Sequence, residues 1–212
     1  MYGRWIVLLN NITNMNDWTW NTQSVMATLN ASCHSEWDRG EMDYYATPPS
    51  ATKKLLENET FSKFILEPAC GEGHISEVLK QNWHEVLSSD IVDRWYGDTL
   101  DYLNDMNFFE SWHWDIITNP PFSKSQEFVE KSMDIIRDGQ KVAMLLRIQF
   151  LEWVKRNAMF KEYPPKIIYV FSRNIRCAKN GDFKNATGNA STYCWFVWEK
   201  WFAGDPIIKW IL

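Results

Sequence analysis

The chain has 212 residues and a mass of 25.1 kDa, which is the size of one domain with at most a short appendage. Hydrophobic residues make up 45% of it and charged residues 23%, which allows a sizeable core and argues against disorder throughout. The apolar run Trp5-Ile6-Val7-Leu8-Leu9 is too short to cross a bilayer and lacks the layout of a signal peptide. These features exclude a membrane protein and disfavour a secreted one.

The cysteines and histidines give no sign of a cross-linked or metal-bound fold. The four cysteines are far apart and form no Cys-x-x-Cys pair, and the four histidines show no ligand spacing. We therefore expect a reduced, cytoplasmic protein without a metal site.

The net charge of −5 is unevenly distributed. Residues 1–140 hold 10 Lys and Arg against 22 acids, a net charge of −12, whereas residues 141–184 hold 10 against three, a net charge of +7. Such a basic block suits a polyanionic partner such as nucleic acid. A solvated charged surface explains it equally well, so charge alone leaves both open.

The first 43 residues are rich in Asn, Thr, Trp and Met and show no sustained hydrophobic period. They are predicted to form an irregular N-terminal arm. Met15 offers an alternative start, which would make residues 1–14 an extension. Three tryptophans are expected to anchor the arm on the rest of the protein, with stacking on nucleic-acid bases as the alternative: Trp18, Trp20 and Trp37.

Residues 44–150 alternate short apolar runs with helical patterns, as βαβ units do. Strands are predicted at 64–66, 86–87, 114–118 and 141–150. Ile75, Val78 and Leu79 recur at helical spacing after the first strand. Phe128, Val129, Met133 and Ile136 predict a second helix, which Asp138-Gly139 ends.

The alternation continues to the end of the chain. A helix is predicted over 151–163, a strand over 167–171, a polar loop over 172–190 and a strand over 191–199. With no repeats and no flexible linker, residues 44–212 are predicted to form one α/β domain. Its architecture would be an open, mostly parallel sheet with helices on both faces.

Ligands bind such sheets outside the carboxyl ends of the strands. There the segment Glu67-Pro-Ala-Cys-Gly-Glu-Gly73 contains two glycines, which permit a sharp turn and close approach of a ligand at the start of a helix. Asp90 follows the next strand and can accept hydrogen bonds from both ribose hydroxyls of a nucleoside. A structural turn and a helix-capping acid are the alternative interpretations.

The most specific signal is Asn119-Pro120-Pro121-Phe122, which follows the strand at 114–118. Two prolines fix the backbone so that no helix forms and carbonyls point outward. The Asn119 side chain and the Pro120 carbonyl then offer two neighbouring acceptors for the two N–H groups of an exocyclic amine. Phe122 offers a face on which a planar base can stack.

These segments, in this order, resemble the class I S-adenosylmethionine-dependent methyltransferases. Within that group they are most similar to the small phage-borne DNA methyltransferases that modify the N6 amino group of adenine. The similarity covers roughly residues 18–212. Further segments share it: Asp43-Tyr-Tyr-Ala-Thr47, Gln149-Phe-Leu-Glu152, Cys177-Ala-Lys-Asn-Gly-Asp-Phe183 and Trp195-Phe-Val-Trp-Glu-Lys200. The resemblance implies a Rossmann-like domain with a seven-stranded sheet whose last strand is antiparallel.

The resemblance also implies S-adenosylmethionine as cofactor. Tyr45 and Thr47 would close over its methionine part, with Thr47 binding the carboxylate. Asp90 would hold the ribose hydroxyls, and Asp101 matches the acid that contacts the cofactor's adenine. The methionine and ribose would be cradled by Glu67, Ala69, Cys70, Gly71 and Gly73, with Asn119 bordering both cofactor and target. Pro48 departs from the pattern, since these phage relatives often have an acid there.

The implied reaction is direct transfer of a methyl group to nitrogen, without a covalent enzyme intermediate. Asn119 and Pro120 would grip the target amine on the backbone that Pro121 helps to fix, and Phe122 would stack on the extruded base. Cys177 and Cys194 lack the Pro-Cys context of a cytosine C5 nucleophile, which disfavours that chemistry.

The expected partner is DNA, double-stranded and read with weak specificity, and the enzyme is expected to be a monomer or weak homodimer. Only 52 positions separate Glu67 from Asn119, too few for a separate recognition domain between them. The candidate DNA contacts are therefore Lys155, Arg156, Arg173, Arg176 and Lys179, for which solvated surface charge is the alternative.

Two other functions stay open. The Asn-Pro-Pro-aromatic sequence also serves methyltransferases of RNA adenine, of guanine N2 and of a release-factor glutamine. A protein that binds the cofactor or DNA without turnover is the third possibility, although the intact amine clamp argues against it.

Overall fold

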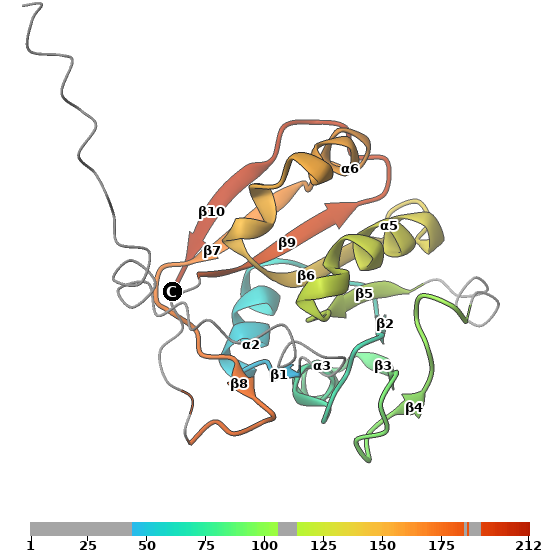
Figure 1. The fold of residues 1–212 in the computed structure, drawn as a ribbon, viewed down its shortest axis with the longest axis vertical. Helices are drawn as coiled ribbons and strands as arrows, with labels where there is room; N and C mark the ends of the chain where they lie inside the picture. Colours follow the sequence, from blue (N-terminus) through green and yellow to red (C-terminus); the bar gives the residue numbers. More distant parts are fainter. Residues whose placement is uncertain (1–43, 106–113, 185, 187–191) are drawn as a thin grey trace, which may run out of the picture. The chain divides into compact units, whose positions relative to one another are not determined.

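The computed structural model describes residues 44–105, 114–184, 186 and 192–212, so the predicted N-terminal arm lies outside the described residues. Its main element is an eight-stranded sheet with the order β10-β7-β9-β6-β5-β2-β3-β4 (Figure 1). The strands are β2 (Phe64–Glu67), β3 (Glu85–Asp90), β4 (Asp98–Thr99), β5 (Asp115–Thr118), β6 (Lys141–Arg147), β7 (Ile167–Phe171), β9 (Tyr193–Glu199) and β10 (Ile207–Ile211). All described strand pairs of this sheet are parallel except those of β9, which runs antiparallel to β6 and β7.

The α/β class and the mostly parallel sheet are confirmed, with one difference in the strand count. The antiparallel strand is β9, at the position predicted for the last strand, but β10 follows it and pairs with β7 in parallel. This makes eight strands rather than seven. Four of the five residues of β10 are exposed, so its sequence Ile-Ile-Lys-Trp-Ile has no alternation that would mark it as a strand.

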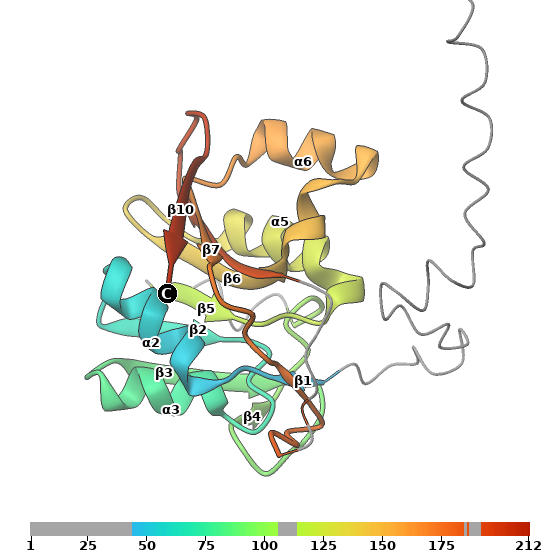
Figure 2. The same ribbon diagram turned by 90° about the vertical axis from the view of Figure 1, so that its left-hand side faces the viewer.

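Helices cover both faces of the sheet (Figures 1 and 2). One face packs against α2 (Pro49–Asn58) and α3 (His74–Gln81), and the other against α5 (Ser125–Ile135) and α6 (Asn157–Glu162). Along β6, Val142 and Met144 belong to the core on the α5 side, whereas Ala143 and Leu145 belong to the core on the α2 side. The continuous apolarity of this strand therefore reflects burial on both faces.

The predicted helix over 151–163 is mostly wrong. Only α6 is α-helical there, preceded by two 3-10 turns at Ile148–Leu151 and Val154–Arg156. Trp153 and Val154 are exposed, so the apolar residues of this segment do not form one core-facing stripe. The packing contacts come later, from Met159 and Phe160.

The helix α2 was not predicted from the sequence. Pro49 stands at its first position, where the missing N–H costs no hydrogen bond, and Ala51 and Leu55 are fully buried against the sheet. The buried Trp195 on β9 donates its indole N–H to the Ala51 carbonyl at 3.0 Å. The helix thereby fixes the segment that precedes it.

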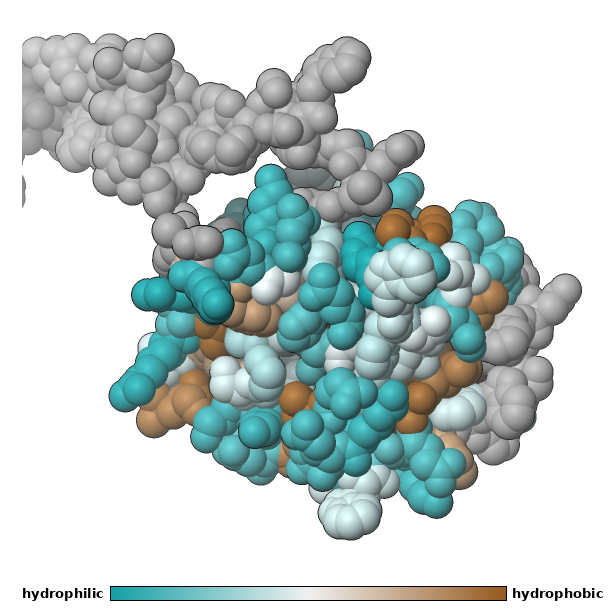
Figure 3. Space-filling model, turned by 90° about the horizontal axis from the view of Figure 1, so that it is seen from below, coloured by the Kyte–Doolittle hydropathy of each residue, from teal (hydrophilic) through white to brown (hydrophobic). Residues whose placement is uncertain are grey.

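That preceding segment forms a small second sheet with the predicted polar loop. The strand β1 (Tyr45–Ala46) pairs antiparallel with β8 (Ala178–Lys179), and Cys177 and Ala178 are buried. The first half of the loop over 172–190 is therefore packed on the sheet domain. Seen from the side where β1, β8 and α3 lie, the surface is mainly hydrophilic, with hydrophobic residues in small separate areas (Figure 3).

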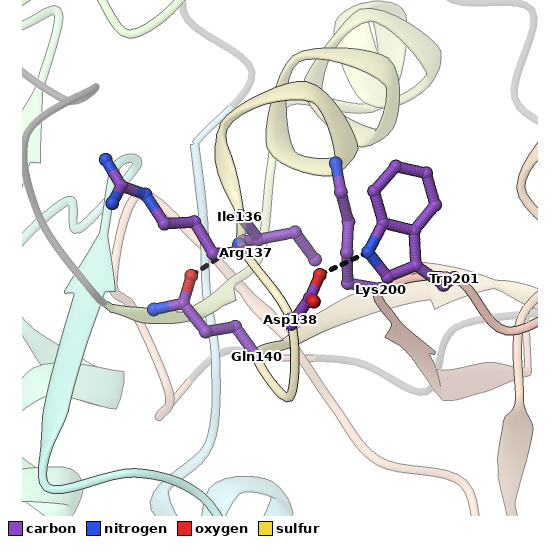
Figure 4. A pocket seen from close by; sticks show the side chains of 6 residues that line it. All are labelled: Ile136, Arg137, Asp138, Gln140, Lys200 and Trp201. Atoms are coloured by element: carbon purple, nitrogen blue, oxygen red, sulfur yellow. Dashed lines mark hydrogen bonds between the residues drawn. The ribbon is translucent and has the colours of Figure 1, made fainter.

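A hollow of about 620 Å³ lies at the amino end of β6, away from the strand ends where ligands bind this kind of sheet. Its lining mixes charges of both signs, and Trp201 donates its indole N–H to Asp138 (Figure 4). In the described part of the chain, no group of three or more His, Cys, Asp or Glu is placed to hold a metal ion. Nor do those residues include a helix with the length and apolarity needed to span a membrane.

Candidate active site

Asn119 lies at the carboxyl end of β5, held in one orientation. Its Nδ2 donates to the Tyr45 carbonyl at 2.8 Å and to Thr47 Oγ1 at 3.1 Å. These two acceptors use both amide hydrogens, so the side-chain oxygen must point the other way. Among the described residues that oxygen, Oδ1, is buried and has no hydrogen-bond partner. A buried acceptor left unpaired costs about 1–3 kcal/mol, which a donor from a ligand would offset.

The two prolines convert the strand into the start of α5. Pro121 has an extended backbone, and Phe122 begins a 3-10 turn that leads into the helix. The Pro121 carbonyl accepts from the Lys124 N–H at 2.9 Å and from Ser125 Oγ at 3.3 Å. These bonds engage the Pro121 carbonyl, and the role predicted for the Pro120 carbonyl stays a prediction.

Phe122 sits among aromatic and cationic side chains. Its ring centroid is 5.6 Å from that of Tyr45 and 6.0 Å from that of Tyr193, both tilted. The guanidinium carbon of Arg147 lies 4.2 Å from the same centroid, over the ring. The stacking face predicted for a base is thus covered by an arginine in this structure.

Glu67 ends β2 and is completely enclosed by the protein. Its carboxylate accepts a hydrogen bond from Ser76 Oγ, which also contacts Ser88 Oγ at 2.6 Å. Burial raises the pKa of Glu67 to about 8, and the Ser76 hydrogen bonds offset only part of that effect. Glu67 therefore holds a proton at neutral pH.

The glycines of the loop after β2 are packed against two tyrosines. Gly71 and Gly73 have positive φ angles of 54° and 82°. A Cβ at Gly71 would lie 2.2 Å from the Tyr44 ring, and one at Gly73 would lie 2.3 Å from the Tyr96 ring. Glycine is therefore required here both for the turn and for the close approach.

Asp90 joins this loop to the end of β3. Its Oδ2 accepts from the Gly71 N–H at 2.9 Å, and its Oδ1 accepts from the Val92 N–H at 3.0 Å and from Arg94 at 3.1 Å. A carboxylate has about four acceptor sites, so three are in use. Asp90 could accept hydrogen bonds from two ribose hydroxyls only if the hydrogen bond from Arg94 were broken. The Arg94 guanidinium also lies over the Tyr44 ring, 4.7 Å from its centroid.

Three cysteines are described, and all are buried thiols. Burial raises the pKa of Cys70, Cys177 and Cys194 to about 12 in each case. A thiol of this kind stays protonated at neutral pH and is a poor nucleophile. Cys70 packs as a small apolar side chain between the glycine loop and the backbone near Tyr96, next to the half-buried Ala69.

Asp101 is engaged with its own turn. Its Oδ1 accepts from the Leu103 N–H at 3.0 Å, and its Oδ2 accepts from Asn104 Nδ2 at 2.7 Å. The preceding residue Leu100 donates its N–H to the Asp90 carbonyl at 3.0 Å. Asp101 therefore stabilises its own turn, and the neighbouring Leu100 joins that turn to Asp90.

The segment after β8 covers the glycine loop. The Asn180 N–H donates to the Tyr44 carbonyl at 3.0 Å, and the Phe183 ring lies 5.2 Å from the His74 ring. Tyr44 in turn accepts from the Glu72 N–H at 3.2 Å. This half of the predicted DNA-contacting loop therefore lies over the cofactor-side residues.

The basic block does not form one continuous surface. Lys141 pairs with Glu59 at 2.6 Å and Lys166 pairs with Glu199 at 2.5 Å. Arg156 lies over the Phe150 ring and donates to the Phe150 carbonyl at 3.0 Å. The remaining candidate DNA contacts are exposed: Lys155, Arg173, Arg176 and Lys179.

Four residues at this edge of the sheet were not predicted as site residues. They are Tyr44, Arg94, Arg147 and Tyr193. Arg147 lies within the strand predicted over 141–150 and ends the observed β6, but it was counted only as part of the basic block. Tyr44 stands in the segment Asp43-Tyr-Tyr-Ala-Thr47, whereas Arg94 and Tyr193 stand in no motif that pointed to the site.

The comparisons with known proteins show the fold. The sequence matches no protein-family model and no curated protein. Among solved structures, a Listeria monocytogenes protein described as a candidate class I S-adenosylmethionine-dependent methyltransferase is 14% identical with a TM-score of 0.54, over 89% of this chain and 72% of that one. A modification subunit of a candidate type I restriction enzyme from Vibrio vulnificus is 15% identical with a TM-score of 0.54, over 89% of this chain and 50% of that one.

A third solved structure bears a different description. A candidate hemolysin from Streptococcus thermophilus is 13% identical with a TM-score of 0.55, over 79% of this chain and 71% of that one. At such low identities the likeness establishes the class I methyltransferase fold and leaves the reaction to be argued from the site.

Proposed function

We propose that the protein transfers a methyl group from S-adenosylmethionine to the N6 amino group of adenine in DNA. The observation that carries this proposal is the buried, unpartnered Oδ1 of Asn119, fixed by Tyr45 and Thr47 next to the Phe122 ring. An exocyclic amine has the donor that this oxygen lacks, and a purine has the flat surface that suits Phe122.

The residues at the neighbouring strand ends fit S-adenosylmethionine. Gly71 and Gly73 let the loop turn tightly against Tyr44 and Tyr96, and Asp90 keeps one acceptor site and gains a second when Arg94 withdraws. Ser89 adds a buried hydroxyl without a partner among the described residues. The bound cofactor supplies a methyl group activated by its sulfonium.

The protein's contribution to the reaction is orientation and exclusion of water. Asn119 Oδ1 accepts one N–H of the amine, the Pro120 carbonyl accepts the other, and the nitrogen lone pair is then directed out of the ring plane. Because Asn119 Oδ1 is buried, these bonds form in a low-dielectric environment where they are stronger. Asn119 is also bonded to the segment that borders the cofactor, so both substrates are positioned by one side chain.

DNA is the proposed substrate because exposed cations follow the carboxyl ends of two strands of the sheet that holds the site. Lys155 follows β6, and Arg173 and Arg176 follow β7. Phosphate contacts of this kind provide affinity, while the Asn119 site selects the amine. Adenine in RNA has the same amino group and a protein glutamine has an amide NH2, so experiment must separate these substrates from DNA.

The test is transfer of label from methyl-tritiated S-adenosylmethionine to four substrates: duplex DNA, single-stranded DNA, total RNA and a protein extract. We expect label in DNA and a loss of about 100-fold in Asn119→Ala, since one preorganised polar contact is removed. Asn82→Ala is the control, because that exposed amide bonds only to the Val78 carbonyl at the other end of α3. Label in RNA or protein alone would contradict the DNA assignment.

A further inference from the structure

Arg147 is the one residue at the Asn119 site whose charge the proposed reaction does not use. It ends β6 and shares a sheet face with Leu145, while Asn119 shares the same face with Ile117. Its guanidinium lies over Phe122, 4.2 Å from the ring centroid. The residue is half-buried, so part of it is accessible to solvent. The arginine therefore stands where the target base is proposed to stack.

Within the described part of the chain, no carboxylate balances the guanidinium. No carboxylate of the described residues lies within ion-pair distance of Arg147, and its buried Nε has no hydrogen-bond partner among them. The polar group close to the charge is the buried Tyr193 hydroxyl, which is neutral and cannot balance it. A charged donor in such surroundings is costly unless a ligand brings an acceptor.

A base and the guanidinium of Arg147 cannot stack on the same face of the Phe122 ring at the same time. Tyr45 and Tyr193 border the ring at 5.6 and 6.0 Å, both tilted, and a base that stacks on the face under Arg147 takes the place of the guanidinium. The displaced side chain must then move toward the surface. There the sugar-phosphate backbone of an extruded nucleotide necessarily remains, because only the base enters the site.

We propose that Arg147 is a nucleotide-binding residue: the entering base replaces its guanidinium on Phe122, and the guanidinium binds the phosphate of that same nucleotide. This inference rests on the proposed function. A phosphate offers the charge and the paired oxygens that a guanidinium binds best. The arrangement links entry of the base to formation of a new ionic contact.

The test compares Arg147→Met, Arg147→Lys and the control Lys63→Met on duplex DNA. Lys63 lies at the amino end of β2, paired with Glu85, far along the strands from Asn119. For Arg147→Met we expect KM for DNA to rise about 10-fold or more, as for loss of a charged hydrogen bond. The slope of log kcat/KM against log salt concentration should become shallower by about 0.9, because one phosphate contact is lost. Arg147→Lys should recover part of the loss in KM.

Two further readouts separate this role from a structural one. Affinity for S-adenosylmethionine, measured by calorimetry, should be unchanged in Arg147→Met. Its Tm should stay the same or rise, because an unbalanced charge is removed from the protein; a purely structural arginine would give a lower Tm.

Different results would overturn the role of Arg147 and the proposed function. Unchanged KM and salt dependence in Arg147→Met, while the wild type still methylates DNA, would overturn the role of Arg147 alone. A raised KM with unchanged salt dependence would also overturn it, in favour of a contact to the base. A wild type that neither binds nor methylates DNA would overturn both.

Discussion

At the scale of single residues, the site is defined by polar atoms whose partners are missing. Asn119 Oδ1, Arg147 Nε and the Tyr193 hydroxyl are buried and unpartnered among the described residues, and all three belong to one end of the sheet. Polar atoms of this kind are rare in folded proteins because each one costs stability. Their concentration around Phe122 is what we expect of a site whose remaining hydrogen bonds come from a substrate.

Glu67 gives a prediction about stability and pH. Its pKa is raised from 4.5 to about 8 by burial, so the folded protein keeps a proton that the unfolded chain loses above about pH 4.5. The stability linked to this group is full below that pH and is lost as the pH rises through 8. Glu67→Gln cannot ionise at this position, so its stability should not show this decrease at high pH.

The measurement is the Tm of both proteins between pH 5 and 8.5. The difference in Tm, Glu67→Gln minus wild type, should grow with pH. Burial also raises the pKa of Asp115, but that group is present in both proteins and cancels in the comparison. A difference that stays constant over the range would contradict the raised pKa of Glu67.

At the scale of elements, β1 connects the two halves of the site. It pairs with β8, and its Tyr45 carbonyl accepts one of the Asn119 amide hydrogens. Thr47, directly after it, accepts the other and is also the residue expected to contact the cofactor. Displacement of this strand is therefore expected to affect cofactor binding and amine orientation together.

Thr47→Val tests that connection with a substitution of nearly equal size. Loss of the hydroxyl removes one of the two bonds that orient Asn119, so kcat should fall between about 2-fold and 10-fold, the value of one hydrogen bond. If Thr47 also holds the cofactor carboxylate, KM for S-adenosylmethionine should rise. Thr52→Val is the matched control, because that buried hydroxyl has no partner within the described residues. Normal kcat and KM in Thr47→Val would refute the connection.

The segment after β7 is tested by charge reversal. Arg173 and Arg176 are exposed, so Arg173→Glu/Arg176→Glu should leave the Tm unchanged. If both contact phosphates, DNA affinity should fall and the slope of log Kd against log salt should decrease by about 1.8. Lys63→Glu/Lys80→Glu, which changes two exposed cations elsewhere, is the control. Equal effects of the two pairs would show that only overall charge matters.

At the scale of the whole molecule, the sequence predicted the strands that are buried on both sides and the motifs at their ends. Strands such as β5 and β6 have continuous apolar sequences bounded by turn residues, and these signals are local. The edge strand β10 and the pairing of β1 with β8 were missed, since exposed or two-residue strands have no pattern of their own. The positions of Arg94 and Arg147 depend on contacts between distant segments, which no local signal contains.

The most direct test of the account identifies the methylated nucleoside. Unmethylated duplex DNA is incubated with S-adenosylmethionine and either wild type, Asn119→Ala or Asn82→Ala, then digested and analysed by mass spectrometry. We expect N6-methyldeoxyadenosine with the wild type and with Asn82→Ala, and formation about 100-fold slower with Asn119→Ala. N4-methyldeoxycytidine instead, or undiminished N6-methyldeoxyadenosine with Asn119→Ala, would contradict it.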